Sequence, residues 1–89
     1  MRTTAPLNLS SLNVADRRLV EHSPFAANMY RVHGFVMDED QADTIARSHG
    51  TTLSDVCLEE GIRRVADVNE DGVLVLRVRT LDFIRALGY

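Results

Sequence analysis

The sequence predicts a small α+β domain whose elements follow one another in the order α-β-α-α-β-α. Its 89 residues suit a single domain, and a composition of 45% apolar and 26% charged residues is typical of a globular chain. Segments 29–36 and 73–80 alternate as strands do, whereas the segments around them repeat with helical spacing. Residues 1–10 follow no period, so we expect a flexible N-terminal arm and a single domain over 11–89.

The first predicted helix covers residues 13–22. Asn13 is a favourable N-cap, Asp16 stands in the first turn where a negative charge suits the helix dipole, and Pro24 follows the end. The segment 29–36 then predicts a strand because its side chains alternate between two sides. One side carries Tyr30, Val32, Gly34 and Val36, and the other carries Arg31, His33 and Phe35.

Two helices joined by a glycine turn are predicted after that strand. Asp38, with Gln41 three residues later, gives the capping-box pattern at the start of the first helix. Gly50 stands where a left-handed C-cap belongs, and Ser54 is the expected N-cap of the second helix. The second helix is predicted to continue as far as its apolar stripe does, and this stripe consists of Cys57, Leu58, Gly61, Ile62, Val65 and Val68.

The strongest strand pattern is VLVLRVRT, residues 73–80, which follows a turn at 69–72. Thr80 is expected to cap a last short helix that ends near Gly88. One face of this strand is fully apolar and carries Leu74, Leu76 and Val78. The other face becomes charged along its length and carries Val73, Val75, Arg77 and Arg79.

The charge balance is acidic, with a formal net charge of −3, and all ten basic residues are arginine. This balance argues against a protein that covers many phosphates. The chain has one cysteine, no apolar run of transmembrane length and no signal-peptide core near its start. We therefore expect a cytoplasmic protein that contacts no membrane.

The sequence contains none of the usual catalytic constellations. No phosphate-binding glycine loop, CxxC pair or HExxH motif is present, and the three histidines fall in different elements without ligand spacing. Cys57 lies on an apolar stripe, which predicts a buried, unreactive thiol. We expect a protein that is not an enzyme and binds neither a metal nor a cofactor.

The helix pair and the strand before it resemble a ribbon-helix-helix domain, most closely antitoxins of the RelB and DinJ kind. The resemblance covers residues 30–66. It depends on Asp38-Glu39-Asp40 at the start of the first helix and on Gly50-Thr51-Thr52-Leu53-Ser54-Asp55 at the start of the second.

This resemblance implies a homodimeric transcriptional regulator whose paired strands enter the major groove of DNA. It would place Arg31, His33 and Phe35 against the bases, with a phosphate at the helix N-terminus near Ser54. A protein toxin would be a second partner of such an antitoxin.

Two other arrangements use the same elements. A winged-helix order, helix-strand-helix-helix-strand, would make TTLSDVCLEE the start of an acidic recognition helix. Alternatively, the chain is a protein-binding module with no nucleic-acid partner, such as a phage inhibitor of a host enzyme or of a CRISPR-type immune nuclease. Its contact residues would then be Arg77 and Arg79 for an acidic partner, or Asp40 and Glu60 for a basic one.

Overall fold

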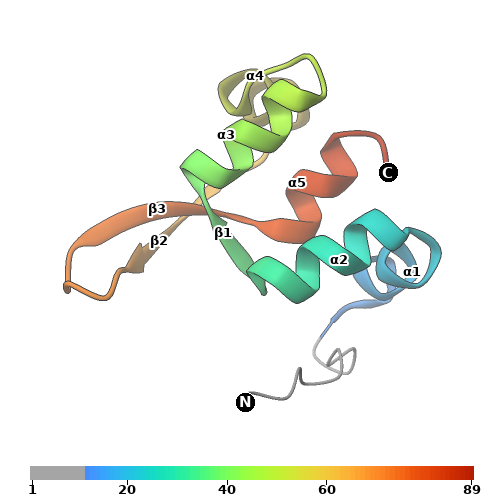
Figure 1. Ribbon diagram of the computed structural model, residues 1–89, viewed down its shortest axis with the longest axis horizontal. Coiled ribbons are helices and arrows are strands. Elements are labelled where there is room, and N and C mark those ends of the chain that lie inside the picture. The colour runs from blue at the N-terminus through green and yellow to red at the C-terminus, as the bar shows by residue number, and fades with distance from the viewer. Residues whose placement is uncertain (1–11) are drawn as a thin grey trace.

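The computed structural model describes residues 12–89, in which five helices and a three-stranded antiparallel sheet form a small α+β domain (Figure 1). The expected α+β class is confirmed, and the expected arm over residues 1–10 lies outside the described residues. The elements are α1 (Val14–His22), α2 (Pro24–His33), β1 (Val36–Asp38), α3 (Glu39–Ser48), α4 (Leu53–Glu60), β2 (Arg64–Val68), β3 (Leu74–Arg79) and α5 (Thr80–Ala86).

The sheet has the strand order β1-β3-β2, so β3 is its central strand. Met37 of β1 pairs with Val78 of β3, and Ala66 of β2 pairs with Leu76 of β3. The end of the sheet that carries β1, opposite the hairpin turn, is called its base. In Figure 1, α3 and α4 lie above this base, and α1, α2 and α5 lie to the right of it. The β2–β3 hairpin extends to the left, beyond all the helices.

The strand predicted over residues 29–36 is wrong for most of its length, because α2 continues to His33. Ser23 starts this helix by accepting a hydrogen bond from the backbone N–H of Ala26 at 3.1 Å, and Pro24 follows as its first residue. Proline suits a first helical turn, where its missing N–H costs nothing. Strand pairing begins only at Val36, after Gly34 has ended the helix with a φ of 78°.

The second helix of the pair is shorter than predicted. It ends at Glu60, because Gly61 takes a left-handed φ of 67° and donates its N–H to the carbonyl of Cys57. The apolar residues beyond Gly61 belong to β2, where alternation rather than a helical stripe decides their placement. The predicted element order therefore lacked both α2 and β2.

Several predicted ends and caps are confirmed, and others are not. Asn13 caps α1 by accepting from the N–H of Asp16 at 2.8 Å, and Gly50 has the expected left-handed φ of 81°. The N-cap of α4 is Thr52 rather than Ser54, since Thr52 accepts from the N–H of the third helical residue. Asp38 is the N-cap of α3, but its side chain makes no capping hydrogen bond.

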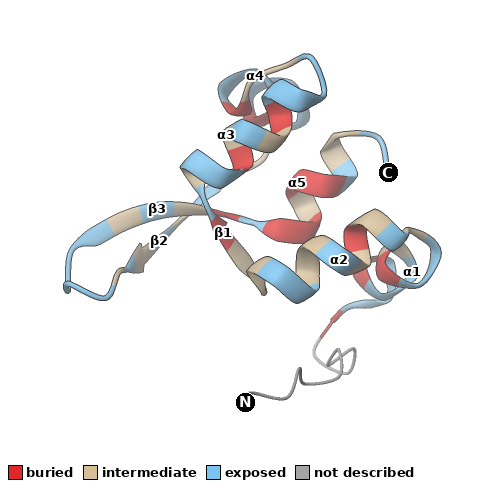
Figure 2. Cartoon of the chain, in the orientation of Figure 1, coloured by how far each residue is buried: buried red, intermediate tan, exposed pale blue. Residues whose placement is uncertain are grey.

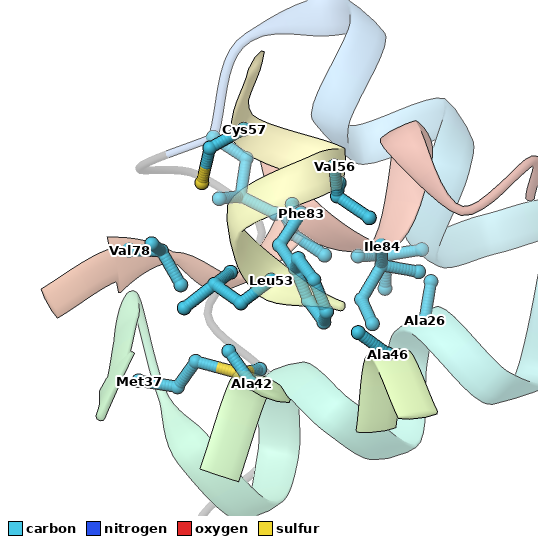
Figure 3. Close-up of a cluster of buried hydrophobic side chains, with 13 residues drawn as sticks. Ala26, Met37, Ala42, Ala46, Leu53, Val56, Cys57, Val78, Phe83 and Ile84 are labelled. Atoms are coloured by element: carbon cyan, nitrogen blue, oxygen red, sulfur yellow. The ribbon is translucent and has the colours of Figure 1, made fainter. Parts of the chain in front are cut away.

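The core lies where the helices meet the base of the sheet, as the buried segments in Figure 2 show. Helix α5 is central to it and contacts α1, α2, α4 and β3. Phe83 and Ile84 of α5 are fully buried. Figure 3 shows them among side chains from α2, α3, α4 and the sheet. The buried apolar residues are Leu12, Val20, Ala26, Met37, Ala42, Ala46, Leu53, Val56, Cys57, Val78, Leu81, Phe83 and Ile84.

The apolar face predicted for the last strand enters this core only at its base. Val78 is completely buried, whereas Leu76 is 49% exposed and Leu74 is 70% exposed. The hairpin carries these two leucines away from the helices, and no described segment covers them. Among the described residues, no helix has the length and apolarity that a membrane crossing requires.

Candidate functional site

The outer face of α4 is acidic with one apolar residue in its middle. Ser54, Asp55, Leu58 and Glu59 are all exposed, whereas Leu53, Val56 and Cys57 face the core. Leu58 is 84% exposed, the largest exposure of any large apolar side chain in the described chain. No arginine lies between Arg47 and Arg63, so this helix contributes no permanent positive charge.

A second acidic surface is a cleft of about 570 Å³ between the start of α3 and the hairpin turn. Leu76 supplies an apolar side chain to its wall. Five carboxylates and a single guanidinium contribute to the lining, which consists of Asp38, Glu39, Asp40, Asn69, Glu70, Asp71, Val75, Leu76 and Arg77. We call this surface the acidic cleft. Helix dipole stabilisation favours the carboxylates at the start of α3, but it does not account for those of the hairpin turn.

The one guanidinium of the acidic cleft is held between carboxylates of the two outer strands. Arg77 Nε lies 3.4 Å from Asp38 Oδ1 on β1 and 3.4 Å from Asp67 Oδ2 on β2. The same Nε is buried, and neither contact has hydrogen-bond geometry. Arg77 therefore neutralises part of the sheet surface and has little freedom to reach a partner.

Positively charged side chains predominate in another cleft, of about 690 Å³, between α5 and the segment that joins α4 to β2. We call it the arginine cleft. Four arginines line it together with two carboxylates and a few small or apolar residues: Glu60, Gly61, Ile62, Arg63, Arg64, Val65, Arg79, Asp82, Arg85 and Ala86.

The residues predicted to contact DNA do not form one face. Arg31 and His33 lie in the last turn of α2, Phe35 lies in the loop before β1, and Ser54 lies on α4. The side-by-side alternation expected of Arg31, His33 and Phe35 is lost, because helical residues two apart point in different directions. Phe35 is 51% exposed and lies under the guanidinium of Arg79, 5.3 Å from it.

The residues predicted to contact a protein are divided between the two clefts. Asp40 and Arg77 line the acidic cleft, and Glu60 and Arg79 line the arginine cleft. Glu60 therefore lies among arginines rather than beside Asp40, and the two arginines of β3 serve different surfaces.

Sequence reasoning did not single out Leu58, Glu70 and Asp71 as possible contact residues, nor Arg63 and Arg85. The pair Arg63-Arg64, two residues after Gly61, was the one local signal for the arginine cleft. The expectation for Cys57 is confirmed as far as burial goes: the thiol is buried, and burial raises its pKa. A thiol of this kind is less readily ionised and therefore less nucleophilic at neutral pH.

Comparisons with known proteins give no relative of this chain: no protein-family model, no curated protein and no solved structure matches it.

Proposed function

We propose that the chain is a protein-binding module of winged-helix arrangement that uses its acidic surfaces to occupy a basic site on a partner protein. The element order α2-β1-α3-α4-β2-β3 and the sheet order β1-β3-β2 support the winged-helix arrangement. In this arrangement α3 and α4 form the helix-turn-helix, and α4 corresponds to the recognition helix.

The outer face of α4 is the observation that carries the proposal. A recognition helix that enters the major groove lies among phosphates and needs positive or neutral polar side chains there. The outer face of α4 carries Asp55 and Glu59 instead, and the hairpin turn adds Glu70 and Asp71. Repulsion between these carboxylates and phosphates opposes DNA binding by this helix.

The same surfaces have the composition of a protein interface. Binding energy in such interfaces is concentrated in a few apolar anchors, and charged residues around them steer the partner and fix its orientation. Leu58 on α4 and Leu76 in the acidic cleft are exposed apolar residues with carboxylates beside them. The chemistry that complements them is a basic surface with apolar pockets, as nucleic-acid-binding enzymes possess. The chain would then act as an inhibitor that competes with nucleic acid.

Binding to DNA as a ribbon-helix-helix dimer has less support. That mode requires a first strand over residues 29–36 that pairs with its copy in a second chain. In the structure, residues up to His33 belong to α2, and β1 pairs with β3 of the same chain. A dimeric regulator is therefore the outcome that the experiment below must distinguish.

The test is affinity capture from the native host with the tagged full chain, followed by direct binding of each purified candidate. Leu58→Ala and Glu59→Lys change the proposed surface, and Glu21→Lys on α1 is a matched charge control because Glu21 is exposed and lies on another helix. We expect the first two variants to weaken the complex at least about tenfold, as loss of an interface anchor or a charge reversal does, and the control to leave it unchanged.

Light scattering with and without duplex DNA at low salt completes the test. We expect no gain in mass with DNA. A dimer of the chain that gains mass with DNA, and loses it as salt rises, would overturn the proposal in favour of a DNA-binding regulator. A purified partner that binds wild type, Leu58→Ala and Glu59→Lys equally would also overturn it.

A further inference from the structure

The arginine cleft brings together guanidinium groups from distant parts of the chain. Arg63 and Arg64 follow the left-handed turn at Gly61, Arg79 ends β3, and Arg85 lies in the last turn of α5. The cleft concentrates four of the chain's ten arginines on a surface to which only Glu60 and Asp82 contribute carboxylates. This concentration of positive charge contrasts with the acidic surfaces described above.

Two of these arginines are already neutralised by carboxylates. Arg64 forms an ion pair with Glu39, and Arg85 forms ion pairs with Asp16 and Asp82. These ion pairs hold the two guanidiniums in place, but they also cancel most of their charge. The positive charge available to a ligand therefore comes chiefly from the other two arginines.

Arg63 and Arg79 have no carboxylate partner within residues 12–89. Arg63 is exposed and forms no hydrogen bond or ion pair there. The guanidinium of Arg79 lies over the ring of Phe35, with its Cζ 5.3 Å from the ring centroid, and this contact leaves its N–H groups unpaired. A cation–π contact of this kind attracts the guanidinium to the ring while its donors stay free for an anion.

We infer that the arginine cleft binds the phosphate group of a nucleotide-sized ligand, with Arg63 and Arg79 as the phosphate contacts. The planar fork of arginine donors matches the oxygens of a phosphate and binds them bidentately. The volume of about 690 Å³ falls in the range of pockets that hold small organic ligands. Ile62, Val65 and Ala86 provide an apolar lining for the part of the ligand that carries no charge.

Phosphate binding in the arginine cleft does not depend on the proposed protein-binding function, because the acidic surfaces and the arginine cleft have no lining residue in common. The ion pair of Arg64 with Glu39 connects the two clefts, but it involves neither Arg63 nor Arg79. A free phosphate ion and the phosphates of a nucleotide share the same chemistry, so the probes must separate them. The probes are inorganic phosphate, pyrophosphate, ATP and the uncharged nucleoside adenosine. Each is titrated into the full chain at low salt by isothermal calorimetry.

We expect ATP to bind more tightly than pyrophosphate or phosphate, and adenosine not to bind. Arg63→Gln and Arg79→Gln should each weaken ATP binding by about tenfold or more, as loss of a charge-assisted hydrogen bond does. Arg31→Gln is the matched control, because Arg31 is also exposed but lies on α2 outside the cleft. Circular dichroism of each variant verifies that the fold is retained.

Absence of binding by any phosphate probe would overturn the inference. Equal weakening by Arg31→Gln and Arg63→Gln would also overturn it, because it would indicate a general effect of charge. Binding of phosphate or pyrophosphate but not ATP would overturn the nucleotide-sized ligand and leave a site for the free anion.

Discussion

The carboxylate of Asp43 on α3 accepts a hydrogen bond from the backbone N–H of Leu53, the first residue of α4, at 3.0 Å. The other oxygen of Asp43 accepts from Arg47 Nε at 2.7 Å. A residue of one helix thereby satisfies a backbone donor at the start of the next. This bond, together with the N-cap at Thr52, sets the entry into α4 and hence the direction of its acidic outer face.

These two donors lower the pKa of Asp43 below its ordinary value of 3.8, the hydrogen bond from Leu53 more than that from Arg47. Because the pKa is lower in the folded state, the stabilisation is complete above the unfolded value and is lost as pH falls through the folded value. We expect Asp43→Ala to lower the melting temperature by several degrees at pH 7, with a difference from wild type that shrinks below about pH 3.8.

Thermal unfolding from pH 7 to pH 2 tests this expectation. Asp71→Ala is a suitable control, because the Asp71 side chain is exposed in the hairpin turn and accepts no hydrogen bond among the described residues. A melting-temperature difference for Asp43→Ala that stays constant over the whole range would contradict the assigned role.

Gly61 ends α4 and turns the chain into β2 with a left-handed φ of 67°. A Cβ at this position would meet no atom within 4 Å, so the cost of a substitution is conformational rather than steric. We expect Gly61→Ala to destabilise the fold by about 1 kcal/mol. Gly61→Asn should cost less, because asparagine tolerates this conformation better than alanine does.

Chemical denaturation of the two Gly61 variants measures the difference directly. If alanine proves as stable as glycine, the left-handed cap does not determine where α4 ends. If asparagine proves less stable than alanine, an effect other than backbone conformation must operate at this position.

Thr80 is completely buried, and its hydroxyl has no hydrogen-bond partner among the described residues. The sequence predicted that this hydroxyl would cap the last helix, but the N-cap of α5 is Arg79 and Thr80 is its first residue. An unpaired buried hydroxyl costs about 1–3 kcal/mol. We therefore expect Thr80→Val, which replaces the hydroxyl with a methyl group, to stabilise the domain.

Thr80→Ser is the matched control for this position, since it retains the hydroxyl and removes a buried methyl group. It should destabilise the domain by about 1 kcal/mol. A fall in melting temperature for valine would show that the hydroxyl has a partner in solution. A rise for serine would show that the methyl group of Thr80 is overpacked rather than stabilising.

Arg77 joins the two outer strands through Asp38 and Asp67, each 3.4 Å from its Nε. Either carboxylate alone leaves the guanidinium with a partner, whereas loss of both leaves a partly buried charge uncompensated. We expect the double variant Asp38→Ala/Asp67→Ala to cost more than the sum of the single variants, by about 0.5 kcal/mol or more. Strict additivity in urea denaturation would argue that the two contacts do not share the charge.

Local signals in the sequence were sufficient for several elements. The N-cap of α1, the left-handed turn at Gly50 and the strand before Thr80 depend on residues a few positions apart, so their energies are present in a short segment. Burial of Cys57 also followed from helical spacing. Neither the composition nor these local signals identified the charged clefts, because each cleft collects residues from several elements.

Residues 29–33 carried two conflicting local signals. The alternation over 29–36 suggested a strand, but the Ser23-Pro24 start favoured a helix that continues to His33. In this case the core decided, since Ala26 is fully buried within the helix contacts of α2 with α1 and α5. A period of two in a short window cannot decide such a conflict without knowledge of what the segment packs against.

The sequence by itself determined an α+β chain with an acidic balance, a capped helix pair and a strong last strand. Contacts between elements decided that residues 64–68 form β2, because a strand is stabilised by hydrogen bonds to a partner strand, here β3, and not by hydrogen bonds within its own segment. The tertiary structure also decided that Leu74 and Leu76 stay exposed, since the hairpin extends beyond the helices that bury Val78. The clefts from which we propose function are formed by residues that such contacts between elements bring together.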